Sequence, residues 1–251
     1  MTFKNSFKIF IISALVMTET FSGVLFKTLS AYADCTTQSD ADRDFDFGEV
    51  SGSVFTNTWA NMSIDIPHGF TTQTGKDLYE AIYYEPDDAV FDGLQATDLL
   101  MVCPEYMDAY MGDRVHELED SLIFTLLYMP DTKSDGTKID DSLTGPALAM
   151  AAVGAKGYEA YVEQGTKVIG GYSYNSYTFD LGNSAKAKYR AENPGKDSPL
   201  FEEDIRVKAE VDIRSASGIK IILLTLTTGE YYGKESLITG GIRNIRGTYN
   251  G

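Results

Sequence analysis

The sequence predicts an α+β fold in which a mostly antiparallel β-sheet carries helices packed on both faces. Apolar and charged residues alternate strictly from Ile205 to Arg214, as in a strand with one face toward solvent. The segments Ser121 to Met129 and Ile219 to Leu226 are apolar on both faces, which requires cover above and below the sheet. Helical spacing separates four apolar residues after Pro104, namely Met107, Met111, Val115 and Leu118.

The first half of the chain predicts strands interleaved with helices. This half begins with a short hairpin, followed by a less regular stretch that contains the helical segment KDLYEAIYY. A compact apolar strand comes next, and a helix begins after it at Pro104. A helix weakened by two glycines follows the next buried strand. The predicted ranges are strands at 54–59, 62–67, 99–103 and 121–129, and the second helix at 145–164.

The second half predicts a tyrosine-rich strand, a polar loop, a long hairpin and a closing helix. In VIGGYSYNSYTFDLG, the apolar pattern changes phase near Asn175 and Ser176, which calls for a bulge or a turn. The polar residues from Asn183 to Pro199 predict a loop, and the SASG turn joins the two hairpin strands. The closing helix would place five residues on one side, namely Leu237, Ile238, Gly241, Ile242 and Ile245.

The N-terminus has the features of an export signal. Lys4 and Lys8 precede an interrupted apolar run, and Ala31-Tyr32-Ala33 supplies the small residues that signal peptidase accepts. We expect a signal peptide at residues 1–33, cleaved between Ala33 and Asp34. The alternative is an uncleaved membrane anchor, although Glu19 within the apolar stretch argues against a stable span. The mature chain would consist of an acidic flexible arm (34–48) and one domain (49–251).

The charge of the chain narrows the range of partners. The formal net charge is −16, and removal of a leader with three lysines and one glutamate makes the mature chain more acidic still. Such a surface repels nucleic acid and anionic membranes. We therefore expect a chain that binds no nucleic acid. From the export signal we expect a secreted or extracellular protein with no stable membrane insertion after cleavage, and the leading hypothesis takes it as a monomer.

The chain has two cysteines, Cys35 and Cys103. In an oxidising compartment this pair favours a disulfide that would attach the mature N-terminus to the domain. Two unrelated free thiols are the alternative, and the sequence does not choose between them.

The order of the elements resembles a known fold. Three strand-forming segments occur together with a middle helix and a closing helix. They are the opening GEVSGSVFTNTWANMSIDIPHGF, the strand GGYSYNSYTF and the hairpin VKAEVDIRSASGIKIILLTLTT. This pattern resembles the PsbP-like fold found in secreted proteins and lipoproteins of Gram-positive bacteria. Phe70 stands where that group usually has tryptophan. The resemblance implies an accessory or binding module, and it carries no catalytic residue onto this chain.

Motifs for catalysis and metal binding are incomplete in this sequence. His116-Glu117 begins a zinc-binding H-E-x-x-H, but Asp120 stands at its fifth position. Ser217 and Lys220 match S-x-x-K at a turn, without the companion motifs. The acidic run misses the glycine and the glutamate of a calcium loop in both registers tested, from Asp40 and from Asp42. We therefore assign no catalytic residue, metal or cofactor.

Four tyrosines are the candidate ligand-binding residues. Tyrosine occurs 16 times, and a surface formed by several of its rings can stack on sugars or on a protein partner. The leading hypothesis is a non-enzymatic binding or accessory module of the bacterial cell envelope, with an unknown protein or a cell-wall glycan as its partner. The alternatives are an extracellular hydrolase of glycans or peptides that uses paired carboxylates, and a passive envelope component. The tyrosines are Tyr172, Tyr174, Tyr231 and Tyr232.

Mass spectrometry of the secreted protein tests the predicted leader. We expect the mature chain to begin at Asp34, because the small residues Ala31 and Ala33 precede that bond. Asp34, Ala33 and Tyr32 before Cys35 do not form a lipoprotein signal. A mature form that begins with a lipidated Cys35 would contradict the assignment.

Overall fold

A computed structural model describes most of the chain after residue 46. The described residues are 47–74, 96–111, 120–133, 136–153, 157–182, 184–196, 201 and 206–245. Several predictions lie outside them: the signal peptide and its cleavage site, most of the acidic arm, Cys35, the helical segment KDLYEAIYY, and His116. No helix in the described part is long and apolar enough to cross a membrane.

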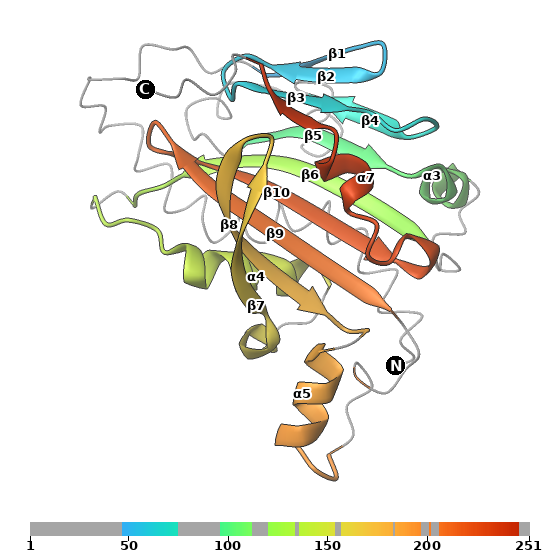
Figure 1. Cartoon of the computed structure of the whole chain (residues 1–251), viewed down its shortest axis with the longest axis vertical. Helices are drawn as coiled ribbons and strands as arrows, with labels where there is room; N and C mark the ends of the chain where they lie inside the picture. The colour runs from blue at the N-terminus through green and yellow to red at the C-terminus, as the bar shows by residue number, and fades with distance from the viewer. Residues whose placement is uncertain are drawn as a thin grey trace.

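A seven-stranded antiparallel sheet forms the centre of the structure (Figure 1). The two central strands, β6 and β10, are buried along nearly their whole length, as their apolar sequences predict. β10 pairs with β9 through a turn in which Ser217 and Gly218 both have positive φ, so the predicted hairpin is confirmed. In spatial order the strands are β4 (Thr71–Thr74), β5 (Ala96–Val102), β6 (Ser121–Pro130), β10 (Ile219–Thr228), β9 (Val207–Ala216), β8 (Tyr172–Asp180) and β7 (Glu163–Ile169).

A four-stranded antiparallel sheet lies beside the larger one. The predicted opening hairpin forms β2 and β3, and alternation along β3 directs Met62 and Ile64 into the core. The C-terminal strand β11 pairs with β3, so the two ends of the described chain meet in this sheet. In spatial order its strands are β1 (Glu49–Ser51), β2 (Val54–Asn57), β3 (Met62–Asp65) and β11 (Ile242–Asn244).

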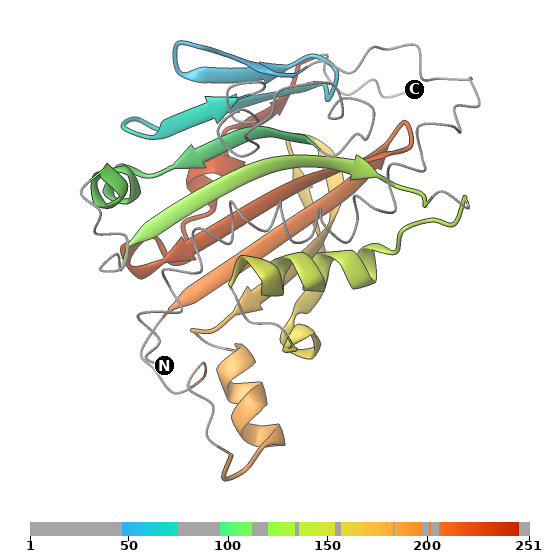
Figure 2. The same ribbon diagram turned by 180° about the vertical axis from the view of Figure 1, so that it is seen from behind.

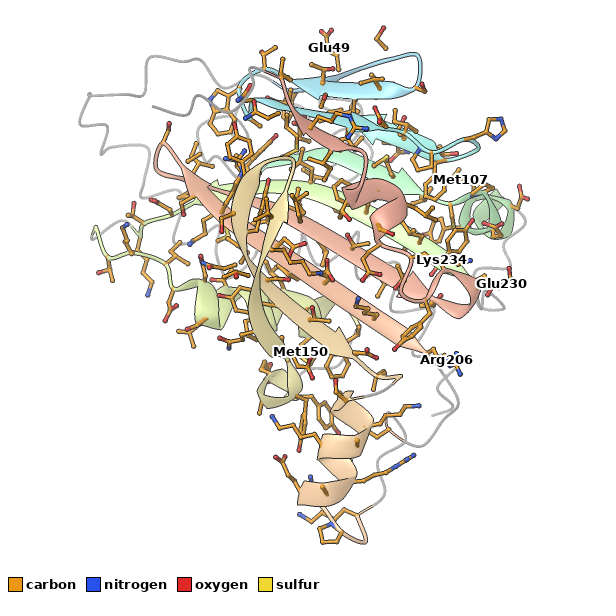
Figure 3. The ribbon with its side chains drawn as sticks, viewed as in Figure 1. Glu49, Met107, Met150, Arg206, Glu230 and Lys234 are labelled. Carbon is orange, nitrogen blue, oxygen red and sulfur yellow. The ribbon has the colours of Figure 1, made fainter. Side chains whose placement is uncertain are left out.

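The helices are few and short within the described residues. α4 packs against β8 and β9 on one face of the large sheet, where Met150 is buried (Figures 2 and 3). The fold is therefore broadly α+β and mostly antiparallel, as predicted, but the prediction of helices on both faces is not confirmed. The remaining elements are α3 (Pro104–Met111), α4 (Asp141–Ala152), η2 (Glu159–Tyr161), α5 (Ser184–Glu192), η3 (Gly229–Tyr231) and α7 (Ser236–Thr239).

α4 differs from the predicted helix at both ends. The helix begins earlier because the Asp140 carboxylate accepts a hydrogen bond from the Ser142 backbone N–H at 2.8 Å, which caps it. Gly145 allows the helix to approach the sheet, since a Cβ there would lie 2.1 Å from the Tyr177 ring. The helix ends at Ala152 instead of continuing to Gln164, and the chain enters β7 by Glu163.

Three other elements were predicted wrongly. VIGGYSYNSYTFDLG is a hairpin whose turn is Gly170-Gly171, and β8 runs through Asn175 without a register shift to either neighbouring strand. The predicted polar loop contains α5. The closing helix stops after four residues, because Gly241 lies against Asp65 (a Cβ would be 2.9 Å away) and the chain turns into β11.

Asp98 joins the two sheets. It lies at a register shift in β5 and is fully buried. Its carboxylate accepts hydrogen bonds from the Gly48 N–H at 2.7 Å, the Asn57 side-chain amide at 2.6 Å and the Tyr128 hydroxyl at 2.7 Å. The Trp59 ring meets Tyr128 edge-on at 5.3 Å. A buried carboxylate is tolerated here because three donors replace its hydration.

Removing this carboxylate should destabilise the protein strongly. Asp98→Ala leaves three donors without this acceptor, and we expect the free energy of unfolding to fall by about 3 kcal/mol or more. Tyr128→Phe removes one of the bonds and should cost about 2 kcal/mol. The control is Asp65→Asn, at an exposed ion pair with Arg243, which should cost less than about 1 kcal/mol. Equal losses for Asp98→Ala and Asp65→Asn in urea unfolding would contradict this role.

Candidate functional site

The most unusual chemistry in the structure lies on one face of β9. Lys208, Glu210, Asp212 and Arg214 point to the same side of this strand, because side chains alternate along it. The sequence predicts that this face meets solvent, and that prediction is wrong. Glu210 is 2% exposed and Asp212 is 0% exposed, since the second sheet and the segment around α7 cover them.

Arg214 occupies one end of this row and connects to the small sheet. Its guanidinium lies over the Tyr172 ring, 4.1 Å from the centroid, and its Nε donates to the Tyr174 hydroxyl at 3.0 Å. Its Nη2 donates to the Ala60 carbonyl oxygen at 2.9 Å. The aromatic ring and the two acceptors replace water around this cation.

Two lysines neutralise most of the acidic charge at the other end of the row. Lys208 forms an ion pair with Glu235, just before α7, and lies 3.6 Å from Glu210. Lys167 of β7 forms an ion pair with Glu210. Burial is the largest single influence on the pKa of Glu235 and would raise it, but the hydrogen bond and charge of Lys208, a backbone hydrogen bond and the charge of Lys167 together lower the pKa. These contacts attach the edge strand β7 and the C-terminal segment to β9.

Asp212 lies in the middle of the row without a cation of its own. Neither of its carboxylate oxygens is in hydrogen-bonding geometry with a partner among the described residues, and the same holds for the buried Ser176 hydroxyl on β8. Burial, followed by repulsion from Glu210, raises the pKa of Asp212 to about 7. The pair of carboxyl groups therefore holds a proton near neutral pH, because two adjacent buried negative charges are unfavourable.

The enclosure of this pair limits its chemistry. A carboxylate that acts on a substrate must touch it, and both side chains are closed to solvent in this structure. Within the described residues, no group of three or more His, Cys, Asp or Glu side chains is arranged to hold a metal ion. The arrangement can store a proton and hold three strands together.

The structure does not bring the four predicted tyrosines together. The strand register places Tyr172 and Tyr174 at the end of the sheet near the β9–β10 turn, and Tyr231 and Tyr232 follow the opposite end of β10. Tyr174 is 1% exposed, and the other three are half-buried.

The second tyrosine pair is held by acidic partners. The Tyr231 hydroxyl donates to Glu105 of α3 at 2.8 Å, and the Tyr232 hydroxyl donates to Asp180. Burial and these bonds raise both pKa values well above that of a free tyrosine. Figure 3 shows Met107 of α3 on the same side of the molecule as Lys234, which follows Tyr231 and Tyr232 in the chain. The hydroxyl groups serve to fix the segment after β10 to α3 and β8.

Cys103 is a buried thiol at the end of β5. The Leu122 N–H lies 3.3 Å from its sulfur as a donor, and burial raises the pKa of the thiol. Cys35, its partner in the proposed disulfide, lies outside the described residues. His68 is exposed in the turn after β3.

Comparison with known protein families, with curated proteins and with solved structures finds no match to this chain. The site therefore has to be interpreted from its own geometry. Sequence reasoning missed the Glu210–Asp212 pair, although one signal was present. Thr225 and Thr227 interrupt the apolar β10 on the face that they share with Glu210 and Lys208, which marks a polar interior.

The raised pKa of Asp212 predicts a measurable dependence of stability on pH. The folded state holds a proton up to about pH 7, whereas the unfolded chain releases it near pH 4. Between these values the group makes the free energy of unfolding fall as pH rises, by at most about 1.4 kcal/mol per pH unit. Asp212→Asn should remove this contribution. The free energy of unfolding of the variant should therefore increase relative to that of the native chain as pH rises from 4 to 7.

Urea unfolding of both proteins at a series of pH values measures this difference. Asp65→Asn makes the same change at an exposed carboxyl and is the matched control, since it leaves the buried Asp212 in place. Parallel curves for Asp212→Asn and the native chain would show that Asp212 titrates normally.

Proposed function

We propose that this chain is a secreted, non-enzymatic binding module of the cell envelope that recruits a protein partner by strand addition at the free edge of β7. A strand at the edge of a sheet presents unpaired N–H and C=O groups, which another extended chain can pair with. The observation that carries the proposal is the exposure of β7. Its residues Glu163 to Thr166 are exposed, and Val168 is 76% exposed.

β7 differs from the other edge strands in the described part of the chain. It has seven residues, whereas β4 has four and β1 and β11 have three each. It has no proline, and its register with β8 has no bulge. Natural sheets often protect an edge by keeping the strand short or by placing a proline or a bulge in it. β7 is long, has no proline and has no bulge, which supports a role in pairing.

The ion pair with Glu210 prepares β7 for this role. Lys167 extends from β7 to the buried carboxylate of β9, across β8. The contact holds the edge strand against the sheet, so a partner would meet a fixed strand and lose less conformational freedom on binding. The resemblance to PsbP-like domains, which generally act as accessory or binding modules, supports the same proposal.

Photo-crosslinking in the producing cell tests the proposal. A benzophenone amino acid at the position of Val168 should form adducts with a protein partner. The control is the same amino acid at the position of Leu143, which is 72% exposed but lies on α4 and not on an edge strand. Mass spectrometry identifies the adducts.

A second variant separates strand addition from simple proximity. Thr166→Pro removes an N–H group at the free edge of β7 and should abolish the Val168 adduct, while circular dichroism shows a retained fold. Equal labelling at both probe positions, or adducts that survive Thr166→Pro, would contradict recruitment through this edge.

A further inference from the structure

We infer that the partner at this edge is a second copy of the chain, with the two β7 strands antiparallel and Gly165 opposite Gly165. The inference rests on the function proposed above and names its partner. Two seven-stranded sheets would then form one continuous sheet across the two-fold axis.

The hairpin geometry fixes which backbone groups of β7 are free. Gly170 and Gly171 have φ values of 58° and 86°, which is a type I′ turn, and Ile169 pairs with Tyr172 directly across it. Residues that flank such a turn exchange hydrogen bonds, and bonding alternates along an antiparallel pair. The odd-numbered residues of β7 therefore bond to β8, and the even-numbered ones direct their N–H and C=O groups outward.

Charge selects one register among the symmetric ones. When Gly165 lies on the two-fold axis, Glu163 of each copy faces Lys167 of the other, on the same face of the sheet. The outward-bonding Gln164 and Thr166 also face each other, so the hydrogen bonds can form. An axis at Lys167 would place the two copies of this lysine opposite each other. An axis at Thr166 or Gln164 would leave Glu163 and Lys167 each facing a residue without the opposite charge.

Lys167 has room for a second carboxylate. Its side chain is 40% exposed although it already pairs with Glu210, and an ammonium group has three donors. Glu163 is exposed, and no ion pair with it is found among the described residues. On each side of the axis, the Lys167 ammonium group of one copy can therefore donate to the Glu163 carboxylate of the other.

The axis itself fits the same register. Gly165 has no positive φ, and a Cβ there would meet nothing within 4 Å, so packing within one chain does not require glycine. Two backbones facing each other in a non-hydrogen-bonded pair approach to about 4.5 Å between Cα atoms, where glycine fits.

Cysteine cross-linking tests the register directly. In a Cys35→Ser background the remaining native thiol, Cys103, is buried. Gly165→Cys should form a disulfide-linked dimer under mild oxidation, because the facing positions lie within bridging distance. Thr166→Cys is the matched control, since its two copies would be diagonal neighbours at about 7–8 Å, and it should remain monomeric on a non-reducing gel.

Each outcome decides the inference. Cross-linking through Thr166→Cys alone would place the axis one residue away and overturn the register. A native chain that is monomeric by light scattering at all concentrations, with no cross-link at either position, would overturn the dimer. If Val168 adducts to a different protein still form and depend on Thr166, then the edge binds as proposed and only the second copy is wrong.

Charge reversal gives an independent readout. Glu163→Lys would place one cation against Lys167 of the partner on each side of the axis, and we expect the dimer dissociation constant to rise about tenfold or more in sedimentation analysis. Glu192→Lys, on the exposed surface of α5, makes the same change in net charge and should leave the constant unaltered. Equal effects of the two variants would show a general charge effect and would contradict the contact.

Discussion

The burial of a charged strand face is the constraint on which the rest of this structure depends. β9 directs four ionisable side chains into the space between the two sheets, where each charge needs a partner or a proton. Arg214 is held by tyrosine rings and by a carbonyl of the small sheet. Lys208 binds the C-terminal segment through Glu235, and Glu210 binds β7 through Lys167. The contacts that satisfy these charges are therefore the same contacts that hold the elements in place.

The proposed function follows from one of these contacts. Lys167 uses part of its side chain to fix β7 against the sheet and leaves the rest at the surface, beside a free and regular strand edge. The interior of the molecule thus keeps its acidic groups enclosed, while the edge of the sheet remains open to pairing. Binding by strand addition needs such an edge, and a strand that is already ordered loses little entropy when a second strand joins it.

The sequence predicted most strands because their hydrophobic pattern is local, as in the buried β6 and the β9–β10 hairpin. It failed where a distant contact decides the outcome. The closing helix ends at Gly241 because Asp65 of β3 lies against it, and nothing near Gly241 in the sequence records that contact. The site was missed for the same reason. Alternating charges along β9 look like a solvent face until residues from the N-terminal hairpin cover them.

An NMR titration of the Asp212 side-chain carboxyl carbon tests the central claim most directly. The signal is assigned by its absence in Asp212→Asn. Enclosure beside Glu210 predicts an apparent midpoint near pH 7. A midpoint near pH 4, as for an aspartate in water, would show that the face of β9 is open to solvent and would contradict the account.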